Sequence, residues 1–207
     1  MHSVQRLYEY RKSISTKPFN ARGKKVVRCR KCQVAEDNCI CNVAHTVSSN
    51  AAFVLLMHDA EILKPSNTAR LIADLFDETY AFIWSRTKPS AELLALLKEE
   101  QYLPFVVFPK MYAQDNRIVH NNQLPMNSLT DKKPLFILLD GSWREAKKMF
   151  RKSPYLDGFA MASFEASNIE SSNEKESVVS ESCTDDFIIG DYIRESMVEN
   201  QLATAQV

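Results

Sequence analysis

An apolar segment that ends in a short polar turn constrains the fold more than any other stretch of this chain. Residues 134–139 read Pro-Leu-Phe-Ile-Leu-Leu, and Asp-Gly-Ser-Trp follows directly at 140–143, before a segment with helical spacing. This order is typical of a buried parallel strand that leads into a helix. Ser142 and Glu145 have the spacing of a capping box, so we expect Ser142 to be the N-cap of that helix.

Asp140 is the residue of this turn that helix capping does not explain. In open α/β sheets, ligands bind at the carboxyl ends of the strands, where Asp140 is expected to lie. The adjacent Gly141 allows a ligand to approach the backbone closely. The alternative is a turn aspartate that accepts hydrogen bonds from local amides.

Strands and helices alternate along the rest of the chain. This alternation predicts an α/β fold with a mostly parallel sheet and flanking helices. Polar residues also follow the first expected strand, where His58 and Glu61 form a possible acid/base pair or, alternatively, ordinary loop contacts. Besides the strand before Asp140, we expect strands at 51–57, 80–85, 105–108 and 159–164. Besides the helix after Ser142, we expect helices at 66–76 and 89–97. Residues 111–133 are expected to be a loop.

Length and composition fit one globular α/β domain with an appendage. The chain has 207 residues, of which 45% are hydrophobic. Its longest apolar runs are much shorter than the roughly 20 residues of a membrane helix, and residues 1–13 lack the apolar region of a secretory signal. We therefore expect a cytoplasmic protein without a membrane partner. Residues 165–190 are rich in serine and acids, which predicts a mobile loop.

The net charge of zero conceals two oppositely charged ends. Residues 1–32 contain ten basic residues and one acidic residue, a net charge of +9, whereas residues 157–200 contain eleven acidic and two basic residues, a net charge of −9. The basic end also carries Tyr8, Tyr10 and Phe19. Basic residues interleaved with aromatic ones are typical of nucleic-acid binding, so we expect an RNA or DNA partner.

Four cysteines lie within a short stretch that begins at the end of this basic segment. The spacing Cys-x2-Cys-x6-Cys-x-Cys suits a tetrahedral Zn²⁺ site. Disulfides also fit the spacing, but a reducing cytoplasm favours the metal. A site with four thiolates has no open coordination position, so we expect a structural role, with residues 1–45 forming a basic arm and zinc-binding knuckle. The expected ligands are Cys29, Cys32, Cys39 and Cys41.

Several short motifs resemble, in the same order, those of the DTW-domain proteins, which are tRNA-uridine aminocarboxypropyltransferases. The resemblance extends from about Cys29 to Val207. It implies a SPOUT-like, knotted catalytic domain over residues 46–207, with S-adenosylmethionine as co-substrate and tRNA as partner. The product would carry a 3-amino-3-carboxypropyl group on the uridine N3. The motifs are the four cysteines, His58-x-x-Glu61, Asn67-Thr68, Phe108-Pro109, Asp140-Gly141-Ser142-Trp143, Ser153-Pro154 and Tyr192…Arg194…Gln201-Leu202-x-Thr204.

The resemblance and the chemistry together nominate the site residues. Asp140, Ser142 and Trp143 are the catalytic candidates. Asp140 either removes the imide proton or stabilises the sulfonium cation, and Trp143 either stacks on a base or packs against the sheet. Arg194 pairs with the carboxylate of the co-substrate or, alternatively, with surface acids. The expected cofactor-binding residues are Asn67, Arg70, Phe108, Pro109, Leu138, Asp140, Tyr192, Arg194, Gln201, Leu202 and Thr204.

The chain departs from the family pattern at Asp59, Ala69 and Ser142, where proline, glycine and threonine are usual. It also has a long acidic insertion before Tyr192 and an early end, which bear on how the cofactor pocket closes. Two other functions fit the sequence: a non-catalytic zinc-knuckle RNA-binding protein and an S-adenosylmethionine-dependent RNA methyltransferase. The chain lacks glycine-rich phosphate loops, which argues against nucleotide hydrolysis and nicotinamide chemistry.

Overall fold

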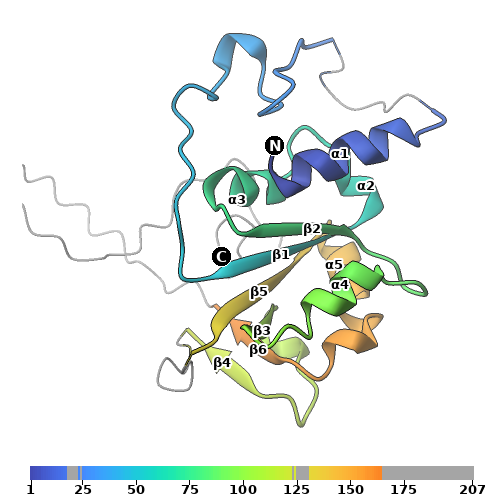
Figure 1. The fold of residues 1–207 in the computed structure, drawn as a ribbon. Helices are drawn as coiled ribbons and strands as arrows, with labels where there is room; N and C mark the ends of the chain where they lie inside the picture. Colours follow the sequence, from blue (N-terminus) through green and yellow to red (C-terminus); the bar gives the residue numbers. More distant parts are fainter. Residues whose placement is uncertain (18–22, 24, 123, 125–130, 165–207) are drawn as a thin grey trace, which may run out of the picture.

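A computed structural model describes residues 1–17, 23, 25–122, 124 and 131–164. Within this part of the chain, six strands form one parallel sheet in the order β2-β1-β5-β3-β6-β4 (Figure 1). The sheet confirms the predicted α/β class. The strands are β1 (Ala52–Met57), β2 (Thr79–Ile83), β3 (Tyr102–Val107), β4 (Val119–Asn121), β5 (Lys133–Asp140) and β6 (Ala160–Ser163).

Helices cover both faces of the sheet. Helices α1, α2 and α3 lie on one face, and α4 and α5 lie on the other (Figure 1). The α-helices are α1 (Ser3–Ser13), α2 (Asp59–Ile62), α3 (Ala69–Leu75), α4 (Ala91–Leu96) and α5 (Trp143–Arg151), and the short 3₁₀ helices are η1 (Glu36–Asn38), η2 (Lys110–Tyr112) and η4 (Pro154–Leu156).

The central strands are apolar throughout because both of their faces are buried. In β5, Leu138 packs with the α1–α3 side of the core, whereas Ile137 and Leu139 pack with the α4–α5 side. Side chains alternate between the faces of a strand, so Asp140 points to the same face as Leu138. The strand therefore aims this carboxylate at α2 and α3, away from the helix that follows it.

The connections of β1 and β5 place a ligand crevice between them. These strands are neighbours, with Met57 paired to Asp140. The chain leaves β1 toward β2 on one side and leaves β5 toward β6 on the other. Adjacent strands whose connections diverge in this way form a topological switch point, and ligands bind at its carboxyl end. The turns that begin at His58 and Gly141 lie at this point.

Two predictions from the sequence need correction. Residues 111–133 were expected to be a loop, but they contain the short strand β4, which pairs with β6 at the edge of the sheet. Three residues at a sheet edge leave too short a pattern to recognise. The basic end was expected to be an arm, but it begins with α1, whose fully buried Val4 packs in the core with Leu55 and Met57. The loop predicted at 165–190 lies outside the described residues.

Candidate active site and metal centre

The Asp140 carboxylate lies at the switch point in a polar environment made by the start of α3. Asn67 Nδ2 donates to Asp140 Oδ2 at 2.6 Å, and Thr68 Oγ1 donates to Oδ1 at 3.4 Å. The N–H of Arg70 donates to Asn67 Oδ1 at 3.2 Å, which fixes the orientation of that amide. Asp140 is only 4% exposed, and Asn67 and Thr68 are 5% exposed each. The structure therefore holds this carboxylate rigidly, as preorganised functional groups require.

A second polar group surrounds the first turn of α5. The N–H and hydroxyl of Ser142 donate to Glu145 Oε2 at 2.8 and 2.6 Å, which confirms the predicted capping box. The other oxygen, Glu145 Oε1, lies 3.2 Å from His58 Nδ1. Partial burial acts against ionisation, but the hydrogen bonds from Ser142 and the nearby charges of His58 and Lys64 outweigh it, so the pKa of Glu145 is lowered.

Backbone contacts join the two polar groups. The His58 N–H donates to the carbonyl oxygen of Asp140 at 2.8 Å, linking the turn after β1 to the end of β5. Gly141 lies where these turns meet. A Cβ atom on Gly141 would lie 3.0 Å from Glu145 Cβ and 3.4 Å from His58 Cβ. Any larger residue here would therefore be in unusually tight contact with Glu145.

Trp143 belongs to an aromatic cluster on the α4–α5 face. Its ring stacks on Phe108 at 5.4 Å between centroids and meets Tyr112 edge-on at 5.6 Å. Lys147 Nζ lies 5.4 Å from the Trp143 ring centroid. The half-buried indole thus packs against the sheet, one of the two roles considered for it. Asp140 and Trp143, which are close in sequence, face different sides of the sheet.

The four predicted metal ligands converge in the knuckle. All four Sγ atoms lie within 4.8 Å of one another, and the cysteines are free thiols. Cys29 Sγ lies 3.6 Å from Cys41 Sγ, and Cys32 Sγ lies 3.8 Å from Cys39 Sγ. Tetrahedral Zn²⁺ with bonds of about 2.3 Å places its sulfur ligands about 3.8 Å apart. The arrangement therefore fits the predicted structural zinc site.

The electrostatics of the knuckle also suit a metal. The backbone N–H groups of Cys32 and Lys31, together with neighbouring thiols, lower the pKa of Cys29 to about 6. Desolvation and the other thiols raise the pKa of Cys41 to about 12. Four thiolates cannot all be charged at such short distances without a cation. A divalent metal supplies that charge and holds the ligands deprotonated.

Helices α1 and α3 hold the knuckle against the sheet domain. Gln5 Nε2 donates to the carbonyl oxygen of Arg30 at 2.6 Å, and Arg70 Nη1 donates to that of Lys31 at 2.9 Å. The Arg70 guanidinium also lies 5.5 Å from the Tyr8 ring centroid. Arg70 is 2% exposed, and desolvation lowers its pKa. Arg70 thus links the knuckle, α1 and the sheet domain.

The family model of the DTW domain matches residues 26–205. The chain belongs to the DTW-domain family. The match includes the zinc knuckle, the switch point and α5, so the family model covers all three parts. No solved structure matches the chain. No helix in the described part of this DTW protein is long and apolar enough to cross a membrane.

The predicted cofactor-binding residues of the DTW domain do not all lie together. Asn67 contacts Asp140, and Leu138 packs on the same face of the sheet. Phe108 lies in the aromatic cluster of the other face, and Pro109 precedes η2 there. Arg70 points toward the knuckle. The remaining predicted residues lie outside the described part of the chain: Tyr192, Arg194, Gln201, Leu202 and Thr204.

Of the two alternatives for His58 and Glu61, the structure shows ordinary contacts in place of an acid/base pair, because each residue has another partner. Glu61 is 3% exposed and forms an ion pair with Lys64, whereas the ring of His58 lies beside Glu145. His58 also stacks on Trp84 with ring centroids 5.9 Å apart. Sequence reasoning missed the contact with Glu145 because it depends on the register between β1 and β5, which no local pattern reveals.

Proposed function

We propose that this DTW-domain protein transfers the 3-amino-3-carboxypropyl group of S-adenosylmethionine to N3 of a tRNA uridine. The uridine N3 attacks the carbon of the aminocarboxypropyl group that is bonded to the sulfonium. The bond between that carbon and sulfur breaks, and 5′-methylthioadenosine leaves. The N3 proton passes to a base. The observation that carries the proposal is the Asp-Gly-Ser-Trp motif of this family at the carboxyl end of the central strand β5.

The environment of Asp140 supports an electrostatic role. Asn67 and Thr68 hold the carboxylate, and its low exposure keeps water away. A fixed negative charge in a poorly solvated site stabilises a nearby sulfonium more strongly than it would in water. The second role considered for Asp140 is removal of the imide proton, which requires the uracil N3–H to reach the carboxylate oxygens that Asn67 and Thr68 contact.

His58 is the more accessible proton acceptor at this edge. Its side chain is 21% exposed, and Glu145 lies where it can stabilise a protonated imidazole. A carboxylate beside an imidazole holds the ring in place and balances the charge that forms when the ring accepts a proton. We therefore assign charge stabilisation to Asp140 and proton transfer to the pair of His58 and Glu145.

The distribution of basic residues supports tRNA as the partner. Helix α5 starts at the switch point and exposes a row of cations along its length. The zinc knuckle adds further basic residues within the +9 segment. Phosphate contacts of this kind position an RNA irrespective of its sequence. The exposed cations of α5 and the residue after it are Arg144, Lys148, Arg151 and Lys152.

A knotted SPOUT-like arrangement is part of the proposal. The supporting feature is that β5 lies between β1 and β3, so a late strand is inserted between two earlier ones.

Product identification tests the activity. The zinc-loaded full chain is incubated with S-adenosylmethionine and bulk tRNA, and nucleosides and small molecules are analysed by mass spectrometry. We expect aminocarboxypropyl-uridine and methylthioadenosine in equal amounts. S-adenosylhomocysteine with a methylated base would indicate methyl transfer instead. RNA binding without either product would indicate the non-catalytic zinc-knuckle protein.

A further inference from the structure

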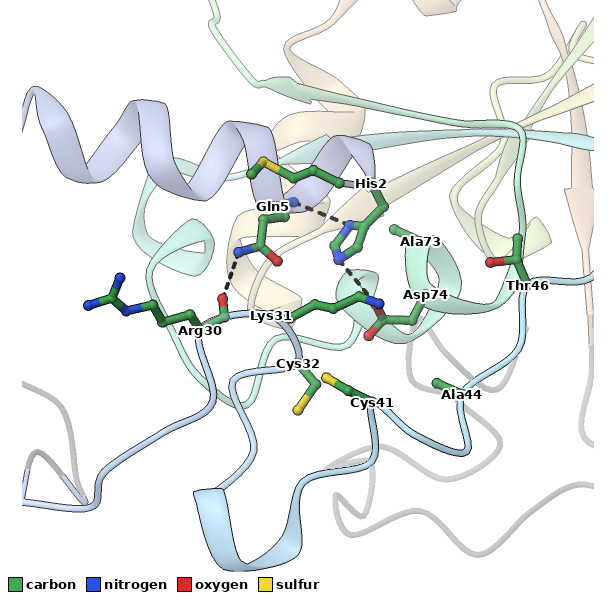
Figure 2. Close-up of a pocket in the computed structure, with 11 residues that line it drawn as sticks. His2, Gln5, Arg30, Lys31, Cys32, Cys41, Ala44, Thr46, Ala73 and Asp74 are labelled. Carbon is green, nitrogen blue, oxygen red and sulfur yellow. Dashed lines mark hydrogen bonds and ion pairs between the residues drawn. The ribbon is translucent and has the colours of Figure 1, made fainter.

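A cavity of about 400 Å³ lies between the zinc knuckle, α1 and the end of α3 (Figure 2). Its size falls within the range of ligand-binding pockets. It is distinct from the switch point, since none of its lining residues belongs to the polar groups around Asp140 or Glu145. The residues that matter to the argument are His2, Gln5, Lys31, Cys32, Cys41 and Asp74.

Gln5 offers this cavity a buried acceptor that has no donor among the described residues. The side chain is 5% exposed, and its Nε2 donates to the carbonyl oxygen of Arg30 at 2.6 Å. That bond fixes the amide orientation and leaves Oε1 inside, without a hydrogen-bond partner in the described part of the chain. Buried polar atoms are nearly always satisfied, so this oxygen indicates a ligand or a bound water.

Asp74 adds a second acceptor group on the same cavity. Its Oδ1 lies 3.1 Å from His2 Nε2, and its side chain is 18% exposed (Figure 2). Cys32 and Cys41 also line the cavity. The carboxylate of Asp74 and the amide oxygen of Gln5 therefore offer acceptors to a group rich in N–H donors. The exposed Arg30 and Lys31 at the knuckle suit the phosphates on either side of such a group.

We propose that this cavity binds one unpaired guanine of the RNA substrate. The Watson–Crick edge of guanine presents adjacent N1–H and N2–H donors, which match a carboxylate and an amide oxygen. Unpaired RNA bases are read in this way, by hydrogen bonds to the edges that pairing would otherwise occupy. The choice of RNA as the ligand rests on the proposed function, whereas the preference for guanine rests on Gln5 and Asp74.

Binding of short oligonucleotides tests the subsite without the transfer reaction. The zinc-loaded full chain is titrated, without S-adenosylmethionine, against fluorescent UUGUU, UUAUU, UUCUU and UUUUU. We expect UUGUU to bind about tenfold more tightly than the other three, the effect of one well-formed base contact. Inosine, which lacks the N2 amino group, should lose much of the preference, and 7-deazaguanosine should keep it. Equal affinities for all four oligonucleotides would overturn the proposal.

Two matched variants assign the preference to the cavity. Asp74→Asn should remove the preference for UUGUU and leave the affinity for UUUUU unchanged. Asp77→Asn, an exposed acid three residues away, should behave as wild type. Melting temperature and zinc content establish that both variants are folded. An Asp74→Asn protein that keeps the full preference would also overturn the proposal.

The experiments distinguish a failure of the guanine-subsite proposal from a failure of the proposed transfer reaction. A chain that makes aminocarboxypropyl-uridine but binds the four oligonucleotides equally refutes the subsite alone. A chain that prefers UUGUU but forms no product refutes the transfer reaction alone.

Discussion

Asp140 illustrates how the alternation of side chains between the two faces of a strand determines the surroundings of one residue. Its neighbours in sequence belong to the cap of α5, yet its carboxylate faces the start of α3 and bonds to Asn67 and Thr68. The role of the residue therefore depends on α3 as well as on its own turn. A change at Asn67 should disturb the same carboxylate.

Replacing Asp140 by Asn tests the charge with little change in shape. Asn67 Nδ2 can still donate to the one remaining side-chain oxygen, and the Thr68 hydroxyl can turn to accept from the new amide, so the fold should keep its stability. If a fixed negative charge assists the reaction, the single-turnover rate should fall by about 100-fold or more. Binding of the co-substrate, measured by calorimetry, should weaken less. A variant that retains the wild-type rate would remove Asp140 from the mechanism.

His58→Asn separates proton transfer from charge stabilisation. We expect a lower rate that recovers as the pH rises, because the uridine imide then loses its proton without a base. Asp140→Asn should not recover in this way, because pH does not replace a fixed charge. The pH–rate profiles of the two variants under single-turnover conditions provide the measurement. Parallel profiles would contradict the division of roles.

The close contacts of Gly141 allow a prediction that concerns stability alone. In Gly141→Ala, the new methyl would lie 3.0 Å from Glu145 Cβ, so Glu145 must move by a few tenths of an ångström within the first turn of α5. Overpacking of this kind costs about 1–3 kcal/mol in the free energy of unfolding. Gly158→Ala is the matched control, because its Cβ would have no neighbour within 4 Å. Urea denaturation of both variants measures the difference, and equal stabilities would contradict the argument.

At the scale of elements, the sequence predicts features that depend on neighbouring residues in the chain and misses features that depend on contacts between distant segments. The strands before His58 and Asp140 and the cap at Ser142 follow from apolar runs and capping chemistry, and the structure confirms them. Helix α1 was missed because its segment is strongly basic, and Val4 becomes a core residue only through contacts with β1. The pairing of His58 with Glu145 was missed for the same reason.

An ion pair attaches α1 to α2. The Arg11 guanidinium donates to both oxygens of Asp59, at 2.5 and 2.9 Å. These hydrogen bonds lower the pKa of Asp59 despite some desolvation. A carboxyl group with a lowered pKa stabilises the fold above its ordinary pKa of about 4, and the contribution disappears as the pH falls through the lowered value.

Asp59→Asn should therefore reduce stability at pH 7, and the difference from wild type should shrink below about pH 4 and vanish once the pH lies below the lowered pKa of Asp59. The Asp59 side chain is 52% exposed, so solvent screening limits the effect to about 0.5 kcal/mol. Urea denaturation at several pH values measures the difference, and Arg11→Gln should show the same pH dependence. A difference that stays constant through acid pH would exclude the ion pair as its cause.

At the scale of the whole molecule, the knuckle is joined to the sheet domain through backbone carbonyl groups. Gln5 of α1 and Arg70 of α3 each bond to a carbonyl in the first cysteine turn. Arg70 is nearly fully buried, so losing this partner would leave a buried cation with fewer hydrogen bonds. The order of the knuckle should therefore influence α1 and α3, although neither helix supplies a metal ligand.

Zinc removal tests this coupling. Cys32→Ser, or chelation of the wild type, should release one zinc ion per chain and weaken RNA binding. Hydrogen exchange should show lost protection in α1 and α3, while β1 and β5 remain protected, because their apolar contacts do not involve the knuckle. The fifth cysteine of the chain, Cys183, is not among the predicted ligands, so Cys183→Ser is the control and should retain the metal. Exchange changes confined to residues 29–41 would show that the knuckle is independent of the helices, and unfolding of the whole chain would show that the sheet itself depends on zinc.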